Sequence, residues 1–133
     1  DEEKDTVVTV PIVIPPPATN YFDFCTHFDQ LKRDPEAFGK YFLTLNPSSI
    51  YHIFSNLIEV DHVRAIVEGL TCETNKDMAD LSLISSLLHS VSLLPRFDLV
   101  VLFMNDEERA KALSLIDFLP SSATTVEIRQ YFL

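Results

Sequence analysis

Apolar residues recur at spacings of three and four positions along this sequence, from Asn20 to the C terminus. This spacing is that of one face of an α-helix. The clearest example has residues at i, i+3, i+4 and i+7, namely Val63, Ile66, Val67 and Leu70. No strand-like alternation competes with it after residue 18. The sequence therefore predicts an all-α fold: a compact bundle of about seven short helices preceded by an extended Pro-rich tail.

Signals for helix starts divide this region into segments. An Asp or Asn directly followed by Pro marks a start, because its side chain caps the helix and Pro fits the first helical position. This pair occurs at residues 34–35 and 46–47, and Asn20 is a further candidate cap. A capping residue followed three positions later by Glu forms a capping box, which predicts starts at Asn105 and Thr124. The predicted helices are short and are joined by tight turns.

Two helix boundaries rest on weaker signals. The helix that starts at 59–61 is expected to end close to Gly69, because glycine weakens a helix. Residues 71–77 are then expected to form a loop. The next helix is expected over about residues 78–93, since Pro95 stops it.

The first 18 residues differ in character from the rest. They begin with acidic side chains, and three consecutive prolines at 15–17 favour an extended polyproline conformation. The apolar stretch at 7–14 could pair as a strand, but no partner strand follows it. We therefore predict a flexible acidic, Pro-rich linker over residues 1–18 and a helical protein-interaction domain over residues 19–133.

The composition limits the classes of function. Asp and Glu total 20 and Lys and Arg total 10, which gives a formal net charge of −10. Such a charge repels phosphate backbones and anionic lipids, so we expect neither nucleic acid nor membrane partners. No run of 18 apolar residues is present that could cross a membrane. The two glycines argue against a glycine-rich phosphate loop.

No pattern of side chains predicts an enzyme, a metal site or a cofactor. The four histidines include no pair at i and i+4, and Cys25 and Cys72 lack ligand spacing. We expect the cysteines to be buried free thiols of a reducing compartment, with a disulfide as the alternative. Ser85, Ser86 and His89 share one helix but no GxSxG motif. A small Ser/His hydrolase is therefore a distant alternative.

The segment from Leu99 to Met104 is apolar on every side of a helix. We expect residues 96–103 to form a short helix, and a helix in a bundle needs only one apolar stripe. This helix is therefore either central and fully buried or exposed on one side as a docking surface. The residues alone leave both interpretations open. Arg96 is of a type enriched at binding hot spots, and Met104 suits an adaptable surface.

Three local patterns together resemble one protein family. The first is FDQLKRDPEAF at residues 28–38, and the second is NPSSIY at 46–51. The third is RFD at 96–98, followed by a hydrophobic stretch and an acidic helix start. Their order and spacing agree over residues 17–132. The sequence thus resembles the C-terminal domains of RNA polymerase II-associated protein 3 and of related axonemal-dynein assembly factors.

The resemblance implies a non-enzymatic co-chaperone scaffold module that docks on the ATPase core of a RuvB-like AAA+ protein. Tetratricopeptide repeats, expected upstream of this chain, would recruit heat-shock chaperones. The assembly would help to build RNA polymerases, small nucleolar ribonucleoproteins and kinases of the phosphatidylinositol-3-kinase-like class. The implied location is the cytoplasm, with the nucleus as a second one. A cilia-specific factor for dynein arm preassembly is the alternative within the same resemblance.

The family pattern also assigns roles to residues near position 96. Arg96 and Leu99 are expected to contact the ATPase, with Asp98 and Met104 as further contact residues. Four neighbours are expected to hold the bundle together: Phe97, Val100, Val101 and Phe103. Pro95 departs from the pattern, because relatives often carry a charged residue there, so the start of this helix is expected to differ.

Overall fold

The computed structural model of the chain describes residues 12–133. This range contains eight α-helices, one 3₁₀ turn and no strand, which confirms the all-α prediction. None of these helices is long and apolar enough to span a membrane. The elements are α2 (Tyr21–Leu31), α3 (Pro35–Phe42), η1 (Pro47–Ser49), α4 (Ile50–Phe54), α5 (Val60–Thr74), α6 (Leu81–Ser92), α7 (Phe97–Val101), α8 (Asp106–Phe118) and α9 (Ala123–Phe132).

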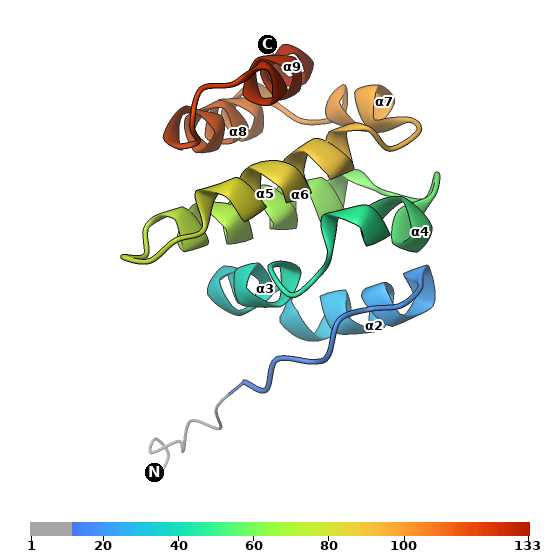
Figure 1. Cartoon of the computed structure of the whole chain (residues 1–133). Helices are drawn as coiled ribbons and strands as arrows, with labels where there is room; N and C mark the ends of the chain where they lie inside the picture. Colours follow the sequence, from blue (N-terminus) through green and yellow to red (C-terminus); the bar gives the residue numbers. More distant parts are fainter. Residues whose placement is uncertain (1–11) are drawn as a thin grey trace, which may run out of the picture.

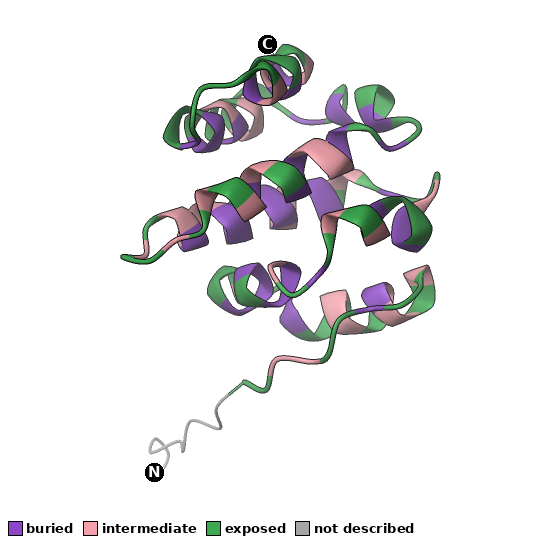
Figure 2. Cartoon of the chain, in the orientation of Figure 1, coloured by how far each residue is buried: buried purple, intermediate pink, exposed green. Residues whose placement is uncertain are grey.

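The helices stack in three layers (Figure 1). α2 and α3 form the N-terminal layer, α4, α5 and α6 the central layer, and α7, α8 and α9 the C-terminal layer. α5 packs against both α3 and α8, and α6 packs against α4 and α9. Each layer contains buried residues, which are purple in Figure 2. The two long central helices therefore connect the outer layers through one core.

Capping hydrogen bonds confirm several predicted helix starts. The side chains of Asn20 and Asp34 accept backbone N–H groups of the first helical turn at 2.8 and 3.0 Å. Asn105 and Glu108 form the predicted capping box, in which each side chain accepts the other's backbone N–H at 2.8 or 2.9 Å. At Asn46 the cap opens the 3₁₀ turn η1, which leads into α4. Each bond satisfies a donor that a helix start leaves open.

The predicted boundary between α5 and α6 is wrong. Residues 71–74, expected in a loop, continue α5. The hydroxyls of Thr71 and Thr74 donate to carbonyl oxygens of the same helix at 2.7 and 2.8 Å, so these side chains are satisfied without leaving it. α6 begins at Leu81, after the cap Asp80, and is shorter than expected.

The predicted capping box at the start of α9 is also wrong. Ser122 is the cap: its hydroxyl accepts the N–H of Thr125 at 3.2 Å, and the Thr125 hydroxyl accepts the N–H of Ser122 at 2.9 Å. Glu127, the expected box partner, instead lies 2.7 Å from Nε2 of His89 on α6. Because α9 begins at Ala123, Glu127 lies beyond its first turn and makes a tertiary contact instead.

Gly69 lies inside α5 and does not end it as expected. α3 crosses α5 so closely here that a Cβ atom on Gly69 would lie 2.9 Å from the Cα of Gly39. A Cβ atom on Gly39 would overlap the carbonyl group of Gly69. The two glycines therefore let the backbones of α3 and α5 touch. Close packing offsets their cost in helix propensity, about 1 kcal/mol each.

The segment before α2 is not helical within residues 12–18. Ile14 packs partly against the core, and Ala18 is buried. Residues 1–11 lie outside the described part of the chain, so the linker over 1–18 stays a prediction. Cys25 and Cys72 are free thiols, as expected, but each is only half-buried.

An aromatic cluster surrounds His62 near the start of α5. The imidazole is buried, with ring centroids 4.9 Å from Phe28 and 5.2 Å from Phe24 in edge-on contacts. Its Nδ1 accepts the backbone N–H of Glu59 at 3.1 Å. Burial lowers the pKa of His62, because the charged ring would lose its hydration. The fold therefore favours the neutral form of this side chain.

We predict that Gly39→Ala lowers the free energy of unfolding, although Ala is the better helix former. The added methyl group overlaps backbone atoms of Gly69, and such overpacking costs about 1–3 kcal/mol. Ser114→Ala on the exposed side of α8 is the control and should change stability by less than about 0.5 kcal/mol. Urea denaturation measures both variants. An unchanged stability of Gly39→Ala would contradict the close crossing of α3 and α5.

The variant His62→Gln should flatten the dependence of stability on pH between about pH 7 and 5. The pKa of His62 is lower in the folded chain, so the unfolded chain binds more protons once the pH falls below about 6.5. The stabilisation from neutral His62 is complete above that pH and is lost as the pH falls toward the folded pKa. Gln does not titrate and keeps an acceptor for the N–H of Glu59. Urea denaturation across this range measures the slope, and equal slopes would contradict the prediction.

Candidate partner-binding surface

α7 and the turn that follows it to Met104 have one buried and one exposed apolar face, which we call the faces of α7. The buried side chains follow the positions i, i+3, i+4 and i+7, and each is at most 5% exposed: Phe97, Val100, Val101 and Met104. The other face carries Leu99, Leu102 and Phe103, which are 48%, 67% and 76% exposed. The short segment is therefore part of the core and also an apolar surface in contact with solvent.

Two predicted roles in this segment are wrong. Met104, expected to contact a partner, is buried, and Phe103, expected to pack in the bundle, is exposed. The helical period counted from Phe97 places Met104 on the inner side and Phe103 away from it. Beyond α7 the chain continues as a tight turn, in which the N–H groups of Phe103 and Met104 donate to the carbonyls of Val100 and Val101 at 3.0 Å. Phe103 therefore takes the place of Met104 in the candidate surface.

Arg96 is exposed and also connects α7 to the loop that precedes α5. Its Nη1 donates to the carbonyl oxygen of Asn56 at 2.9 Å. Its backbone φ is 69°, in the left-handed region, where a residue other than glycine costs on the order of 1 kcal/mol. Ser55 is the other such residue among those described, with φ 49°. Strained backbone tends to gather at functional sites, so two strained turns joined by Arg96 support a binding role here.

Arg109 of α8 holds the opposite end of α7. Its Nη2 donates to the carbonyl of Val101 at 3.1 Å, and its Nε donates to the carbonyl of Met104 at 3.2 Å. Carbonyls at the end of a helix lack partners within that helix. Arg96 and Arg109 thus fix both ends of α7, and its exposed face points in one defined direction.

A groove of about 380 Å³ runs beside the exposed face of α7. Residues of α2, of the loop between α4 and α5, of α5 and of α7 line this α7 groove: Tyr21, Leu57, Ile58, Glu59, Val60, Arg96, Leu99, Val100 and Phe103. Burial raises the pKa of the Tyr21 hydroxyl, and the Cys25 thiol and the Glu59 carboxylate add to the shift. Tyr21 therefore stays neutral, and the mostly apolar walls suit an apolar side chain of a partner.

Three of the four predicted contact residues lie at this surface. Arg96 and Leu99 line the α7 groove, and Asp98 is exposed in the first turn of α7. Leu57 also lines the groove and is 46% exposed, although it follows Ile50, Ile53 and Phe54 at helical spacing. α4 ends before it and the chain turns at Ser55, so the helical period cannot be extended to Leu57.

The residues of the hydrolase alternative lie elsewhere, on α6. Ser85, Ser86 and His89 line one hollow of about 500 Å³. His89 pairs with Glu127, and no hydrogen bond joins a serine hydroxyl to the His89 ring within residues 12–133. A nucleophilic serine needs such a bond to its base, so the geometry favours a structural pair between α6 and α9. No group of three potential metal ligands occurs in the same range.

The fold and the surface define a class of protein, a helical protein-interaction domain with a preformed apolar groove. Residues 17–109 match the family described as the potential Monad-binding region of RPAP3, which is RNA polymerase II-associated protein 3. The chain belongs to this family of RPAP3 C-terminal domains. The resemblance inferred from the sequence is thereby confirmed.

Individual relatives agree with this assignment. RPAP3 of Homo sapiens is 31% identical over 113 residues and RPAP3 of Xenopus tropicalis 32% over 112 residues. The matches cover 83% and 84% of this chain but only 16% and 17% of those proteins. The NMR structure of the C-terminal domain of human RPAP3 matches with a TM-score of 0.80 at 25% identity, over 94% of this chain and 95% of that one. This match confirms the expected fold.

Two neighbouring substitutions test the assignment of the α7 faces. Phe103→Ala should change the free energy of unfolding by less than about 0.5 kcal/mol, because the ring is exposed. Met104→Ala should lower it by about 2–5 kcal/mol, because it leaves a cavity in the core. Urea denaturation followed by circular dichroism measures both. A larger loss of stability for Phe103→Ala than for Met104→Ala would contradict this assignment and place Phe103 in the core.

Proposed function

We propose that the domain is a non-enzymatic scaffold module that docks on a RuvB-like AAA+ ATPase through the α7 groove and the exposed face of α7. The apolar face of Leu99, Leu102 and Phe103, held in a fixed orientation, carries this proposal. Apolar surface of this kind gains free energy when a partner covers it. Membership of a family described as a protein-binding region supports a protein as the partner.

The chemistry of the surface suits a binding hot spot. Phe103 and Leu99 are anchors whose burial contributes roughly 25 cal/mol per Å² of apolar area removed from water. Arg96 uses Nη1 for the carbonyl of Asn56 and has further N–H donors for a partner's carbonyl or carboxylate. The exposed Asp98 offers an acceptor to a basic side chain of the ATPase. Since the ends of α7 are already fixed, little ordering entropy is lost on association.

Docking of this kind would tether a co-chaperone to the ATPase. The chain spans about a sixth of the length of the curated relatives it matches. In the proposed arrangement, tetratricopeptide repeats elsewhere in the protein recruit heat-shock chaperones for the assembly of polymerases, small nucleolar ribonucleoproteins and related complexes. The proposed location is the cytoplasm, with the nucleus as a second one. A role in dynein arm preassembly would use the same surface with a different client.

Monad is a second candidate partner, because the description of the family names it. The α7 groove is one surface on which such a protein could dock. ATPase and Monad can be compared on the same variants, which shows whether they compete for one surface.

The double variant Leu99→Ala/Phe103→Ala should lose binding to the ATPase while keeping its fold. Truncation of hot-spot residues typically costs about 2 kcal/mol or more, so retention should fall by at least about tenfold. The immobilised 133-residue chain is incubated with each of two purified RuvB-like paralogues, and bound protein is quantified. Val126→Ala removes a 55% exposed side chain from α9 and is the matched control, with full retention expected.

Equal retention by the double variant and the control would contradict the docking site. If the immobilised wild-type chain retained neither RuvB-like paralogue, the ATPase would not be its partner. Monad is tested in the same assay, and its loss in the double variant alone would assign it to the α7 groove.

A further inference from the structure

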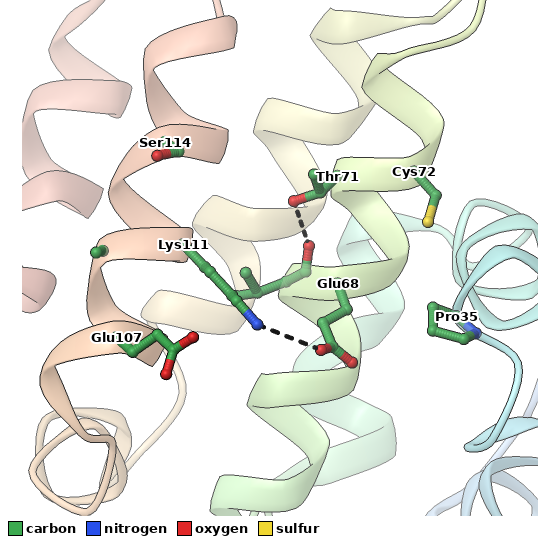
Figure 3. A pocket seen from close by; sticks show the side chains of 9 residues that line it. Pro35, Glu68, Thr71, Cys72, Glu107, Lys111 and Ser114 are labelled. Carbon is green, nitrogen blue, oxygen red and sulfur yellow. Dashed lines mark hydrogen bonds and ion pairs between the residues drawn. The ribbon is translucent and has the colours of Figure 1, made fainter.

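A second groove, of about 530 Å³, lies on the outer side of α5 between α8 and the start of α3 (Figure 3). We call it the α5 groove. Thr71 and Cys72 of α5 form its floor, with α8 on one side and Pro35 of α3 on the other (Figure 3). Val67 of α5 and Ala110 of α8 also line it. It shares no residue with the α7 groove. Its volume lies within the range of about 300–1,000 Å³ that is typical of ligand pockets.

The floor of the α5 groove favours apolar side chains. The Thr71 hydroxyl donates to the carbonyl of Val67 at 2.7 Å and is therefore already satisfied (Figure 3). Burial raises the pKa of the Cys72 thiol, and the carboxylates of Glu36 and Glu73 add to the shift, so the thiol stays neutral. The floor therefore has no charge and no free hydroxyl donor for a polar ligand. Burying a polar group there without a hydrogen bond costs free energy, so an apolar side chain is favoured.

The mouth of the α5 groove is acidic. Glu68 of α5 and Glu107 of α8 line it. Lys111 is the basic residue of the lining, and its Nζ lies 4.0 Å from Oε2 of Glu68 (Figure 3). Both side chains of this pair are about half exposed, at 55% and 51%, so water screens it and a cation from a partner can replace it. The net charge of −10 means that the chain as a whole also attracts a basic partner.

We infer that the α5 groove binds an amphipathic helix with an apolar face and flanking Lys or Arg residues. A helix laid against two packed neighbours buries its apolar face, and its basic flanks meet Glu68 and Glu107. The inference goes beyond the proposed function and does not rest on it. Val60 lines the α7 groove and Thr71 the α5 groove, roughly 16 Å apart along α5, so two partners can bind at once.

Two synthetic peptides test this inference on the full chain. Both are helices of about 14 residues with leucines at i, i+3, i+4 and i+7, and one carries Lys at the flanking positions where the other carries Glu. N-ethylmaleimide labels the two cysteines, and mass spectrometry follows each rate. The Lys peptide should slow labelling of Cys72 by about tenfold near saturation, as the free groove is depleted. Cys25 on α2 is the internal reference and should keep its rate.

Three variants separate the α5 groove from other surfaces. Ala110→Trp fills the groove and should raise the Kd of the Lys peptide by about tenfold or more, whereas Val126→Trp, an exposed control, should not. Glu68→Gln adds no bulk and should weaken binding by up to about fivefold. The double variant Leu99→Ala/Phe103→Ala should bind the Lys peptide as the wild type does, which separates this test from that of the ATPase.

Several outcomes would overturn the inference. If the Glu peptide protected Cys72 as well as the Lys peptide does, the acidic mouth would have no role in binding. Equal slowing of Cys25 and Cys72, or undiminished binding to Ala110→Trp, would remove the groove as the site. Protection of Cys72 that rises with protein concentration in the absence of peptide would assign the groove to a second copy of the chain.

Discussion

A helix of five residues has no stability of its own in water, because nucleation costs more than its few hydrogen bonds return. α7 depends on its neighbours. The Phe97 ring packs edge-on against Tyr131 and Phe132, with centroids 5.1 and 5.9 Å apart. Arg96, at the start of α7, donates a hydrogen bond to the loop before α5. Arg109 donates hydrogen bonds to the carbonyls of Val101 and Met104 at the other end of α7. The direction in which the apolar face points is therefore set by the core and by two guanidinium groups.

Local chemistry was sufficient to predict the fold class and several helix starts, as the capping box of Asn105 and Glu108 shows. It was not sufficient at Gly69, which the sequence alone presents as a helix breaker. The role of Gly69 depends on Gly39, which lies on another helix, and no local pattern reports that contact. The sequence also offered two capping residues near the start of α9, and the structure uses Ser122 in place of Thr124, which leaves Glu127 in contact with His89.

The candidate site was predictable in part. Arg96 and Leu99 followed from the family resemblance, and both lie in the α7 groove. The opposite positions of Phe103 and Met104 were also predictable, because the helical period counted from Phe97 separates the two faces. The groove itself could not be predicted, since its walls come from α2, from the loop before α5 and from α7, which meet only in the folded chain.

Hydrogen–deuterium exchange of the chain, alone and bound to the RuvB-like ATPase, tests the central claim most directly. Binding at the α7 groove should slow exchange of backbone amides in residues 55–60 and 96–104. The amides of residues 67–74 and 107–114, around the α5 groove, should exchange as in the free chain. Protection confined to that second set, with unchanged exchange across 96–104, would contradict the account of α7 as the docking surface.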